Sequence, residues 1–579
     1  MIITLAGGGS TFTPGIVKSI ALRKEELEVE EIRLYDINEE RQRKVGVLVD
    51  WILHEDLGLD IKLTVTTDKK TAFSDADFVF AQMRVGGYAM REQDEKIPLR
   101  HGCVGQETCG CGGLAYGMRT IFPMVELIDD VEKYAKPTYW ILNYSNPAAI
   151  VSEACRVMRP NARIINICDM PIAIIDLVCA ALEIDKKDVE YDYFGLNHFG
   201  WFTSIRHKGE EVLPQLREYV KEHEILLPSS YLKGMSSLMK SNTDNEDESK
   251  QNRHTKGSWY YVWKGVYEIM ELFPEYLPNT YLNYYLQQKE FVEHSNPERT
   301  RANEVEETRE HNLFAGIDRY EATGEIDEST FYAGSHGDWI ADLAVALKND
   351  TKARFLVICQ NRGAIPNMPY DAMVELPAYI GKNGPEVISR DNIPLFQQGL
   401  MMQQLNSEKL VVQACIEGSY EKALQAFTLN KTVPSMTVAK EVLDEMIEAL
   451  SLPHLNFTGV FTHFAVSDEN GDPYTQLQFS RFTHAIERME QATGHRFAIR
   501  HCANSGAVIN YPEMHLDMVR PGLLLYGVFP AKETGGLDLR PAMSLYSRVS
   551  DVTHHHKGDT ISYGRTFTCP RDMRLAVLP

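Results

Sequence analysis

This chain opens with a strand, a glycine turn, a helix and a second strand that ends in an acid. No other feature limits the possible folds as strongly as this order of elements. The apolar run at 2–6 leads into three glycines, and the run at 31–35 leads into an aspartate. Glycines let a backbone approach a pyrophosphate closely, and the acid can accept hydrogen bonds from a ribose. A lone glycine triplet is also typical of a plain tight turn, and Phe12 stands where the third fingerprint glycine would be. The flanking strands and the acid favour a dinucleotide site. Its predicted contacts are Gly7, Gly8, Gly9, Ser10 and Asp36.

Apolar runs of strand length recur along the first third of the chain, at 78–81, 139–142 and 163–167, with helical segments between them. Strands that alternate with helices are typical of a parallel, doubly wound sheet. Further along, long amphipathic helical stretches dominate. We therefore predict an α/β fold with a Rossmann-like, dinucleotide-binding domain over 1–195 and a helix-rich α+β lobe over 196–450.

The pattern changes again near residue 451. Apolar runs at 459–465, 497–503 and 518–526 are predicted as strands, and 475–492 as a helix. This is the alternation of a β/α barrel, but only about three of its eight strands are present. We predict that 451–579 is a partial barrel that runs into a truncated β domain.

Composition narrows the partners and the compartment. The 579 residues carry a formal net charge of -22, which disfavours nucleic acid and anionic membranes as partners. No apolar stretch is long enough to span a bilayer, and the start of the chain lacks the basic flank and apolar core of a signal peptide. The ten cysteines are scattered without a disulfide framework. We therefore expect a cytoplasmic protein whose cysteines are free or bind metal.

Cys168 and Asp169 follow the predicted strand at 163–167, and His198 lies thirty residues after the cysteine. The C-terminal end of a strand is where α/β sheets place their ligands. A thiolate and an imidazole together suit a borderline divalent ion. The alternative is one buried cysteine and one ordinary core histidine. A carboxylate beside the cysteine is not easily buried without a partner, so we favour a metal site formed by Cys168 and His198.

Several long motifs follow one another over the first 450 residues. They are 6–15, 84–86, 90–95, 105–110, 143–147, 168–171, 197–201, 278–281 and 300–304. With these motifs the chain closely resembles glycoside hydrolase family 4, the NAD-dependent glycosidases, which are an exception to two-carboxylate hydrolysis. Within that family, Cys-Asp-Met-Pro is typical of members that act on 6-phospho-α-glucosides. The resemblance implies NAD- and metal-dependent hydrolysis of such substrates, with Mn²⁺ as the expected ion.

The resemblance also implies roles for individual residues. NAD would take a hydride from C3 of the sugar, and Tyr281 would remove the acidified C2 proton. The cation held by Cys168 and His198 would stabilise the enediolate. Asp169 would protonate the departing C1 oxygen, and Glu107 would raise the basicity of the tyrosine. The implied substrate contacts are Arg91, Asn146 and Arg301.

The expected substrate is a phosphorylated disaccharide such as maltose 6'-phosphate, and the family implies a homodimer or homotetramer formed through the first 450 residues. Two features depart from the family pattern. Cys111 stands where proline is usual, which predicts a less rigid loop. The polar segment 241–256 is predicted to be an inserted surface loop. Neither departure removes a predicted catalytic residue.

The motifs at 461–465, 502–506, 519–523 and 562–564 resemble a second family, the alanine racemases, which use pyridoxal phosphate. The lysine that forms the Schiff base belongs to a motif that this chain lacks. We therefore expect no pyridoxal phosphate and no racemisation, and a segment that is loosely ordered or sticky. The contacts that the resemblance implies are Ser505, Gly522 and Leu523 for the phosphate, Arg520 for the pyridine nitrogen, His463 for the ring and Tyr563 as a base.

The sequence leaves two alternatives to a glycosidase open. One is a racemase-related protein, dependent on pyridoxal phosphate, with an added domain. The missing lysine counts against it. The other is a non-catalytic protein that binds NAD or a sugar phosphate. The presence of both Asp169 and Tyr281 counts against that one.

Overall fold

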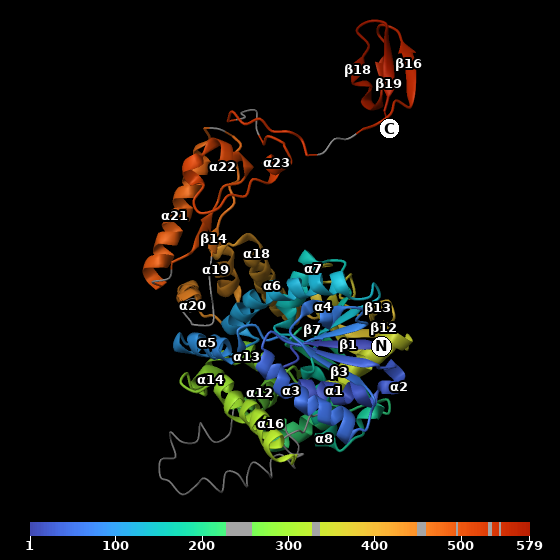
Figure 1. Cartoon of the computed structure of the whole chain (residues 1–579). Helices are drawn as coiled ribbons and strands as arrows, with labels where there is room; N and C mark the ends of the chain where they lie inside the picture. The colour runs from blue at the N-terminus through green and yellow to red at the C-terminus, as the bar shows by residue number, and fades with distance from the viewer. Residues whose placement is uncertain are drawn as a thin grey trace. The chain divides into compact units, whose positions relative to one another are not determined.

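The computed structural model describes residues 1–226, 258–326, 336–448, 459–469, 471–493, 496–530, 535–542 and 546–578. The chain forms two compact units, Met1–Ala449 and Leu450–Pro579, and each is described by itself (Figure 1). The predicted insertion at 241–256 and the junction between the two resemblances lie outside the described residues. The domain boundary predicted at 195 stays a prediction.

A parallel sheet lies at the centre of the first unit. Its strands are β1 (Ile2–Ala6), β2 (Glu31–Tyr35), β3 (Lys62–Thr66), β4 (Phe78–Ala81), β5 (Trp140–Asn143) and β6 (Ile164–Asn166). Their spatial order is β3-β2-β1-β4-β5-β6, and each neighbouring pair is parallel. This is the order of the dinucleotide-binding doubly wound fold, whose direction reverses between β1 and β4. The predicted fold class is therefore confirmed.

Helices cover both faces of these strands (Figure 1). Those in the first half of the unit are α1 (Thr13–Leu22), α2 (Lys24–Leu27), α3 (Glu39–Trp51), η1 (Ile52–Asp56), α4 (Lys69–Phe73), α5 (Gly87–Arg100), α6 (Gly110–Tyr134), α7 (Ala148–Met158), α8 (Met170–Leu182) and η2 (Lys186–Asp188).

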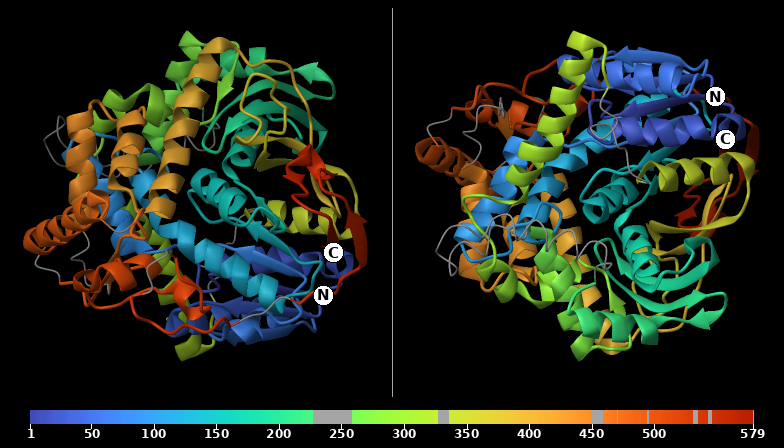
Figure 2. Two further views of the ribbon diagram at one scale, coloured as in Figure 1. Left: turned by 90° about the horizontal axis from the view of Figure 1, so that it is seen from above. Right: turned by 90° about the horizontal axis from the view of Figure 1, so that it is seen from below.

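Alternate strand residues supply two separate cores. Phe78 and Phe80 pack in one core with α1 and with α17 (His336–Asn349), which lies beside α1 although it is distant in sequence (Figure 2). Val79 and Ala81 pack on the opposite face against α6 and α7. A strand covered on both faces must be apolar at every position, which explains the continuous apolar runs in the sequence.

Antiparallel strands extend the sheet beyond β6. They are β7 (Val189–Leu196), β8 (Phe199–His207), β9 (Glu210–Glu211), β10 (Leu277–Pro278), β11 (Ala353–Gln360), β12 (Met373–Gly381) and β13 (Gly384–Val387). The extension runs β6-β11-β12-β7-β8-β10. The β7–β8 hairpin places His198 in a two-residue turn, where its φ is 61°.

The second lobe also contributes helices. They are α9 (Leu213–His223), α12 (Ser258–Leu272), α13 (Leu282–Leu286), α14 (Gln288–Glu293), α15 (Arg301–Val305), η3 (Glu306–Glu310), α16 (His311–Thr323), α18 (Leu395–Glu417), α19 (Tyr420–Leu429) and α20 (Met436–Glu448). Of these, α9, α12 and α18 contact the antiparallel strands. No described helix combines the length and the apolar composition that a membrane crossing requires.

The second unit contains short elements around a small core. They are β14 (Gly459–Phe461), α21 (Pro473–Thr493), β15 (Ile499–His501), α22 (Ser505–Asn510), η5 (Pro512–Met514), α23 (Gly522–Leu525), β16 (Asp551–His555), β17 (Thr560–Ile561), η6 (Tyr563–Arg565), β18 (Phe567–Thr568) and β19 (Met573–Val577). Strands β14 and β15 are parallel, as barrel strands are.

The strand predicted at 518–526 is wrong. This segment forms the short helix α23, in which the amide of Leu525 donates to Pro521 at 3.1 Å. A barrel strand is held by two neighbours, and the described part of this unit supplies β14 and β15 as its parallel strands. Without a partner for its ladder, the segment satisfies its amides locally.

Candidate active site

One cavity of about 330 Å³ opens where the parallel strands end. The loops after β4, β5 and β6 form one wall, and α13 and α15 of the second lobe form the other. This is the edge at which open α/β sheets bind their ligands. The predicted residues that line it are Arg91, Glu107, Asn146, Cys168, Asp169, Tyr281 and Arg301.

Cys168 and His198 meet at one end of this cavity. The thiol follows β6, the imidazole occupies the β7–β8 turn, and Sγ lies 3.2 Å from Nε2. Burial lowers the pKa of His198 to about 4, so the imidazole is neutral and suited to hold a cation. Burial, with the charges of Glu375 and Asp169, raises the pKa of Cys168 well above its usual value. A bound cation would oppose that effect and stabilise the thiolate.

The donor pair fits a borderline divalent ion, because it combines a soft sulfur with an imidazole nitrogen. Among the described residues, no group of three or more histidine, cysteine and acidic side chains could hold an ion. A cation with two protein ligands keeps positions for water and substrate oxygens, which is typical of catalytic sites rather than structural ones.

Tyr281 lies directly beside the histidine. The two ring centroids are 4.2 Å apart, and the tyrosine amide donates to Asn279 Oδ1 at 3.1 Å at the start of α13. Burial raises the pKa of Tyr281 well above its usual value, and Tyr284 and Cys168 add to the shift. A phenolate at this position therefore needs nearby positive charge.

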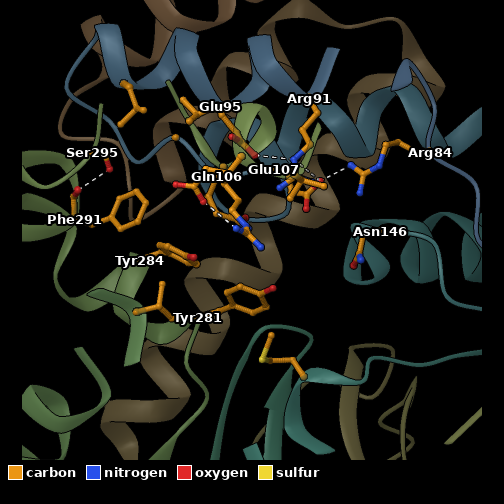
Figure 3. A pocket seen from close by; sticks show the side chains of 18 of the residues that line it. Arg84, Arg91, Glu95, Gln106, Glu107, Asn146, Tyr281, Tyr284, Phe291 and Ser295 are labelled. Atoms are coloured by element: carbon orange, nitrogen blue, oxygen red, sulfur yellow. Dashed lines mark hydrogen bonds and ion pairs between the residues drawn. The ribbon is translucent and has the colours of Figure 1, made fainter. Parts of the chain in front are cut away.

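Glu107 is held by two guanidinium groups (Figure 3). It forms ion pairs with Arg84 and, at 3.2 Å, with Arg91, whose Nε also donates to Glu95 at 2.8 Å. Burial alone would raise the pKa of Glu107, but the charges of Arg84 and Arg91 outweigh it and lower the pKa. Glu107 is thus a partly buried carboxylate, and its charge lies among those that raise the pKa of Tyr281.

Asp169 occupies the N-cap position of α8, but its side chain does not cap the helix. It hydrogen-bonds the hydroxyl of Tyr144, whose pKa is raised well above its usual value by burial and by this carboxylate. The carboxyl group therefore faces the cavity from the same strand end as the thiol.

Arg301 begins α15 directly after the cap residue Thr300, which forms a capping box with Asn303. Its guanidinium pairs with Glu304 at 2.8 Å. The backbone amide of the next residue, Ala302, donates to Glu95 Oε2 at 2.8 Å. Glu95, which also accepts a hydrogen bond from Arg91, thereby holds the start of α15 against α5.

The glycine turn adjoins the cavity through Phe12. The amides of Gly7 and Gly8 both donate to Tyr35 O at 2.9 Å, and the amide of Gly9 donates to Asp36 Oδ2 at 2.9 Å. The glycine amides are thus engaged within the turn, and the N-terminus of α1 follows directly. Asp36 keeps lone pairs for a ribose hydroxyl, since a carboxylate can accept about four hydrogen bonds.

Several residues of the cavity have no role predicted from the sequence. Arg84 and Tyr144 follow β4 and β5 as Cys168 follows β6, so the rule that ligands bind at strand ends could have found them. Arg309, from η3, lines the same cavity, and its guanidinium carbon lies 4.4 Å from the centroid of the Phe12 ring. No local sequence signal identifies Arg309.

In the second unit, four of the residues implied by the racemase resemblance lie near one another. Arg520 contacts His501 and, at 3.2 Å, His463. The Leu523 amide donates to Ser505 Oγ at 2.9 Å. In contrast, the Tyr563 side chain is 98% exposed.

Comparison with family models divides the chain in the same way. Residues 2–184 match the model of the family 4 glycosyl hydrolases, and 193–433 match their C-terminal domain. Residues 437–530 match the N-terminal domain of alanine racemase, and 542–579 match its C-terminal domain. The two resemblances stated from the motifs are confirmed.

Relatives and solved structures agree on the first unit. The 6-phospho-alpha-glucosidase of Leptotrichia buccalis is 48% identical over 449 residues, 77% of this chain and 97% of that protein. A 6-phospho-alpha-glucosidase from gut microorganisms, solved in complex with NAD and glucose-6-phosphate, is 45% identical with a TM-score of 0.72. A second structure from gut microorganisms, in complex with NAD and Mn²⁺, is 42% identical with a TM-score of 0.71. Both alignments cover 79% of this chain and 99% of the solved chain.

Proposed function

We propose that this chain hydrolyses 6-phospho-α-glucosides with NAD and a divalent cation. The chain belongs to family 4 of the glycosyl hydrolases. The observation that carries the proposal is that one cavity gathers Cys168, Asp169 and Tyr281, with His198 Nε2 3.2 Å from the thiol. A bare binding site for a sugar phosphate has no need of a thiol–imidazole pair beside a buried tyrosine.

The side chains divide the chemistry between them. When bound, NAD accepts a hydride from C3 of the sugar and later returns it, and the cation polarises the adjacent oxygens. Tyr281 removes the C2 proton, which the C3 carbonyl has acidified. Asp169 gives a proton to the C1 oxygen as that bond breaks, so the leaving group departs as a neutral alcohol. Water then adds to C1.

The surrounding charges support these roles. Glu107 orients Arg84 and Arg91 on the cavity wall. Arg91, Asn146 and Arg301 present donors to the sugar hydroxyls or to the 6-phosphate, and arginine is well suited to a phosphate because it can bond two oxygens at once. We propose a phosphorylated disaccharide such as maltose 6'-phosphate as the substrate. We also propose a cytoplasmic homodimer or homotetramer assembled through the first unit.

Hydrolysis of a chromogenic 6-phospho-α-glucoside tests this function. The full chain should release the chromophore with NAD and Mn²⁺, and should lose at least about 100-fold in rate when either is removed, since each supplies a step that no side chain can. The corresponding glucoside without phosphate should be a poor substrate. Undiminished turnover by protein stripped of NAD and treated with a chelator would contradict the proposal.

The second unit is expected to have no racemase activity. The residues that would surround pyridoxal phosphate are present in part, but the lysine needed for a Schiff base is missing from the sequence. Incubation with pyridoxal phosphate and L-alanine should yield no D-alanine, and the protein should show no aldimine absorbance. Formation of D-alanine by the full chain, above a no-protein control, would refute this expectation.

A further inference from the structure

Glu375 is a buried carboxyl group that the proposed mechanism does not use. It lies on β12 and is 1% exposed. In the described part of the chain it forms no salt bridge, and it does not line the cavity. A carboxyl group is rarely buried in this way without a role, because its removal from water is costly.

The contacts of Glu375 connect two parts of the active site. Tyr193 donates its hydroxyl hydrogen to Oε2 at 3.0 Å, and Asn197 donates from Nδ2 to Oε1 at 3.5 Å. The hydroxyl of Tyr193 also accepts a hydrogen bond from Asn279 Nδ2 at 3.1 Å. On its other side, Asn279 Oδ1 accepts the backbone amide of Tyr281 at 3.1 Å. One continuous path of hydrogen bonds therefore runs from Asn197 to Tyr281.

The two ends of the path adjoin different functional groups. Asn197 directly precedes His198, and its side chain also hydrogen-bonds the Cys168 thiol. Asn279 fixes the backbone from which the Tyr281 phenol extends. The thiol–imidazole pair is thus joined to the proposed base through buried side chains on two strands, β7 and β12, and on the segments that follow β7 and β10.

The backbone leaves just enough space for this path. A Cβ on Gly200 would lie 2.3 Å from the Tyr193 hydroxyl, and a Cβ on Gly195 would lie 2.4 Å from Gly200 Cα. Gly195 is also the residue that faces Glu375 across the β7–β12 pairing. Glycine at position 200 leaves room for the Tyr193 hydroxyl, and glycine at position 195 lets the two strands of the hairpin pack closely opposite Glu375.

We propose that Glu375 is a positioning residue, which holds the turn that carries His198 in a fixed relation to the base Tyr281. Its two acceptor oxygens bind Asn197 and Tyr193 at the same time, so a shift at one end is resisted at the other. The inference rests on the proposed function, because it assigns Cys168 and His198 to a cation. A purely structural carboxyl would affect folding stability without affecting that cation.

Glu375→Gln tests the proposal, because it keeps the length of the side chain but turns one acceptor oxygen into an N–H donor. The Mn²⁺ dissociation constant, measured by electron paramagnetic resonance of free Mn²⁺ without substrate, should rise about 10- to 100-fold. The value of kcat should fall by a similar factor, while the NAD dissociation constant should change less than about twofold. Tyr193→Phe breaks the same path at the next link and should also raise the Mn²⁺ dissociation constant and lower kcat. This second variant tests the proposal if Glu375→Gln fails to fold.

Matched controls separate positioning from a general cost of altering buried polar groups. Glu408→Gln changes another buried carboxyl, on α18, which accepts a hydrogen bond from Gln404 at 2.7 Å. Tyr139→Phe removes the hydroxyl of a buried tyrosine, which bonds Glu132 at 3.3 Å. Both should leave Mn²⁺ affinity within twofold. Unchanged Mn²⁺ affinity in Glu375→Gln and Tyr193→Phe, with a lowered Tm alone, would overturn the proposal. Wild-type protein that binds Mn²⁺ but does not turn over substrate would contradict the proposed function alone, and the Mn²⁺ affinities of the two variants would still decide whether Glu375 holds the turn that carries His198. Wild-type protein that binds no Mn²⁺ overturns both.

Discussion

Replacing Tyr281 by phenylalanine should lower kcat for a 6-phospho-α-glucoside by about 10²- to 10⁴-fold, the contribution typical of a positioned general base. The phenol is buried beside His198, and the substitution removes the hydroxyl and leaves the ring that packs against Tyr284. Dissociation constants for NAD and Mn²⁺ should therefore change little. Because a base acts in its deprotonated form, wild-type activity should rise with pH through the pKa of this group in the loaded enzyme.

The position of the lost proton can be followed directly. Wild-type enzyme that acts in D₂O should place deuterium at C2 of the product, and the phenylalanine variant should form product and exchange the C2 proton more slowly by the same factor as its loss in kcat. Tyr284→Phe is the matched control, since this tyrosine stacks on Tyr281 and lines the same cavity. It should retain activity within about tenfold. Equal losses in both variants would indicate damage to the cavity rather than removal of a base.

The parallel half of the fold could be predicted from the sequence because its signals are local. Each buried strand is a short apolar run, and the acid after β2 and the thiol after β6 follow such runs directly. The C-terminal edge of a parallel sheet then brings those residues together without further information. For this reason Cys168 and Asp169 could be placed at one site before the structure was known.

The antiparallel half could not be predicted in this way. The strands β11 and β12 lie far from β7 in the sequence, yet β12 pairs with β7 and brings Glu375 to Asn197 across 178 residues. No periodicity in one stretch of sequence specifies a partner so distant. The roles of Glu107, Arg91 and Arg301 came from the resemblance to a family, and the ion pairs around Glu107 became visible only with the structure.

In the second unit, a local sequence pattern predicted the wrong secondary structure. The apolar run at 518–526 has the composition of a barrel strand, but the structure forms α23 there. The sequence pattern of a strand presumes neighbours that complete its hydrogen bonds. The sequence of this segment therefore indicated the family that it resembles, but not the conformation that it adopts.

Replacing Asp169 by asparagine should have an effect that depends on the leaving group. The amide cannot give a proton to the C1 oxygen, so hydrolysis of maltose 6'-phosphate, whose leaving group is an alcohol, should slow by about 10²- to 10⁴-fold. A nitrophenyl 6-phospho-α-glucoside releases an acidic phenol, which departs as an anion without assistance. With this substrate the loss should be less than about tenfold, as measured by initial rates with saturating NAD and Mn²⁺.

Tyr281→Phe supplies the control for this comparison, because the C2 proton must be removed whichever group later departs. Its loss should therefore be similar for both substrates, whereas the loss in Asp169→Asn should differ between them by at least tenfold. Asp169 lies next to Cys168 and bonds the Tyr144 hydroxyl, so a change in cation binding is the main competing explanation. A cation effect would slow both substrates equally in Asp169→Asn, and that result would remove the carboxyl group from its assignment as the acid.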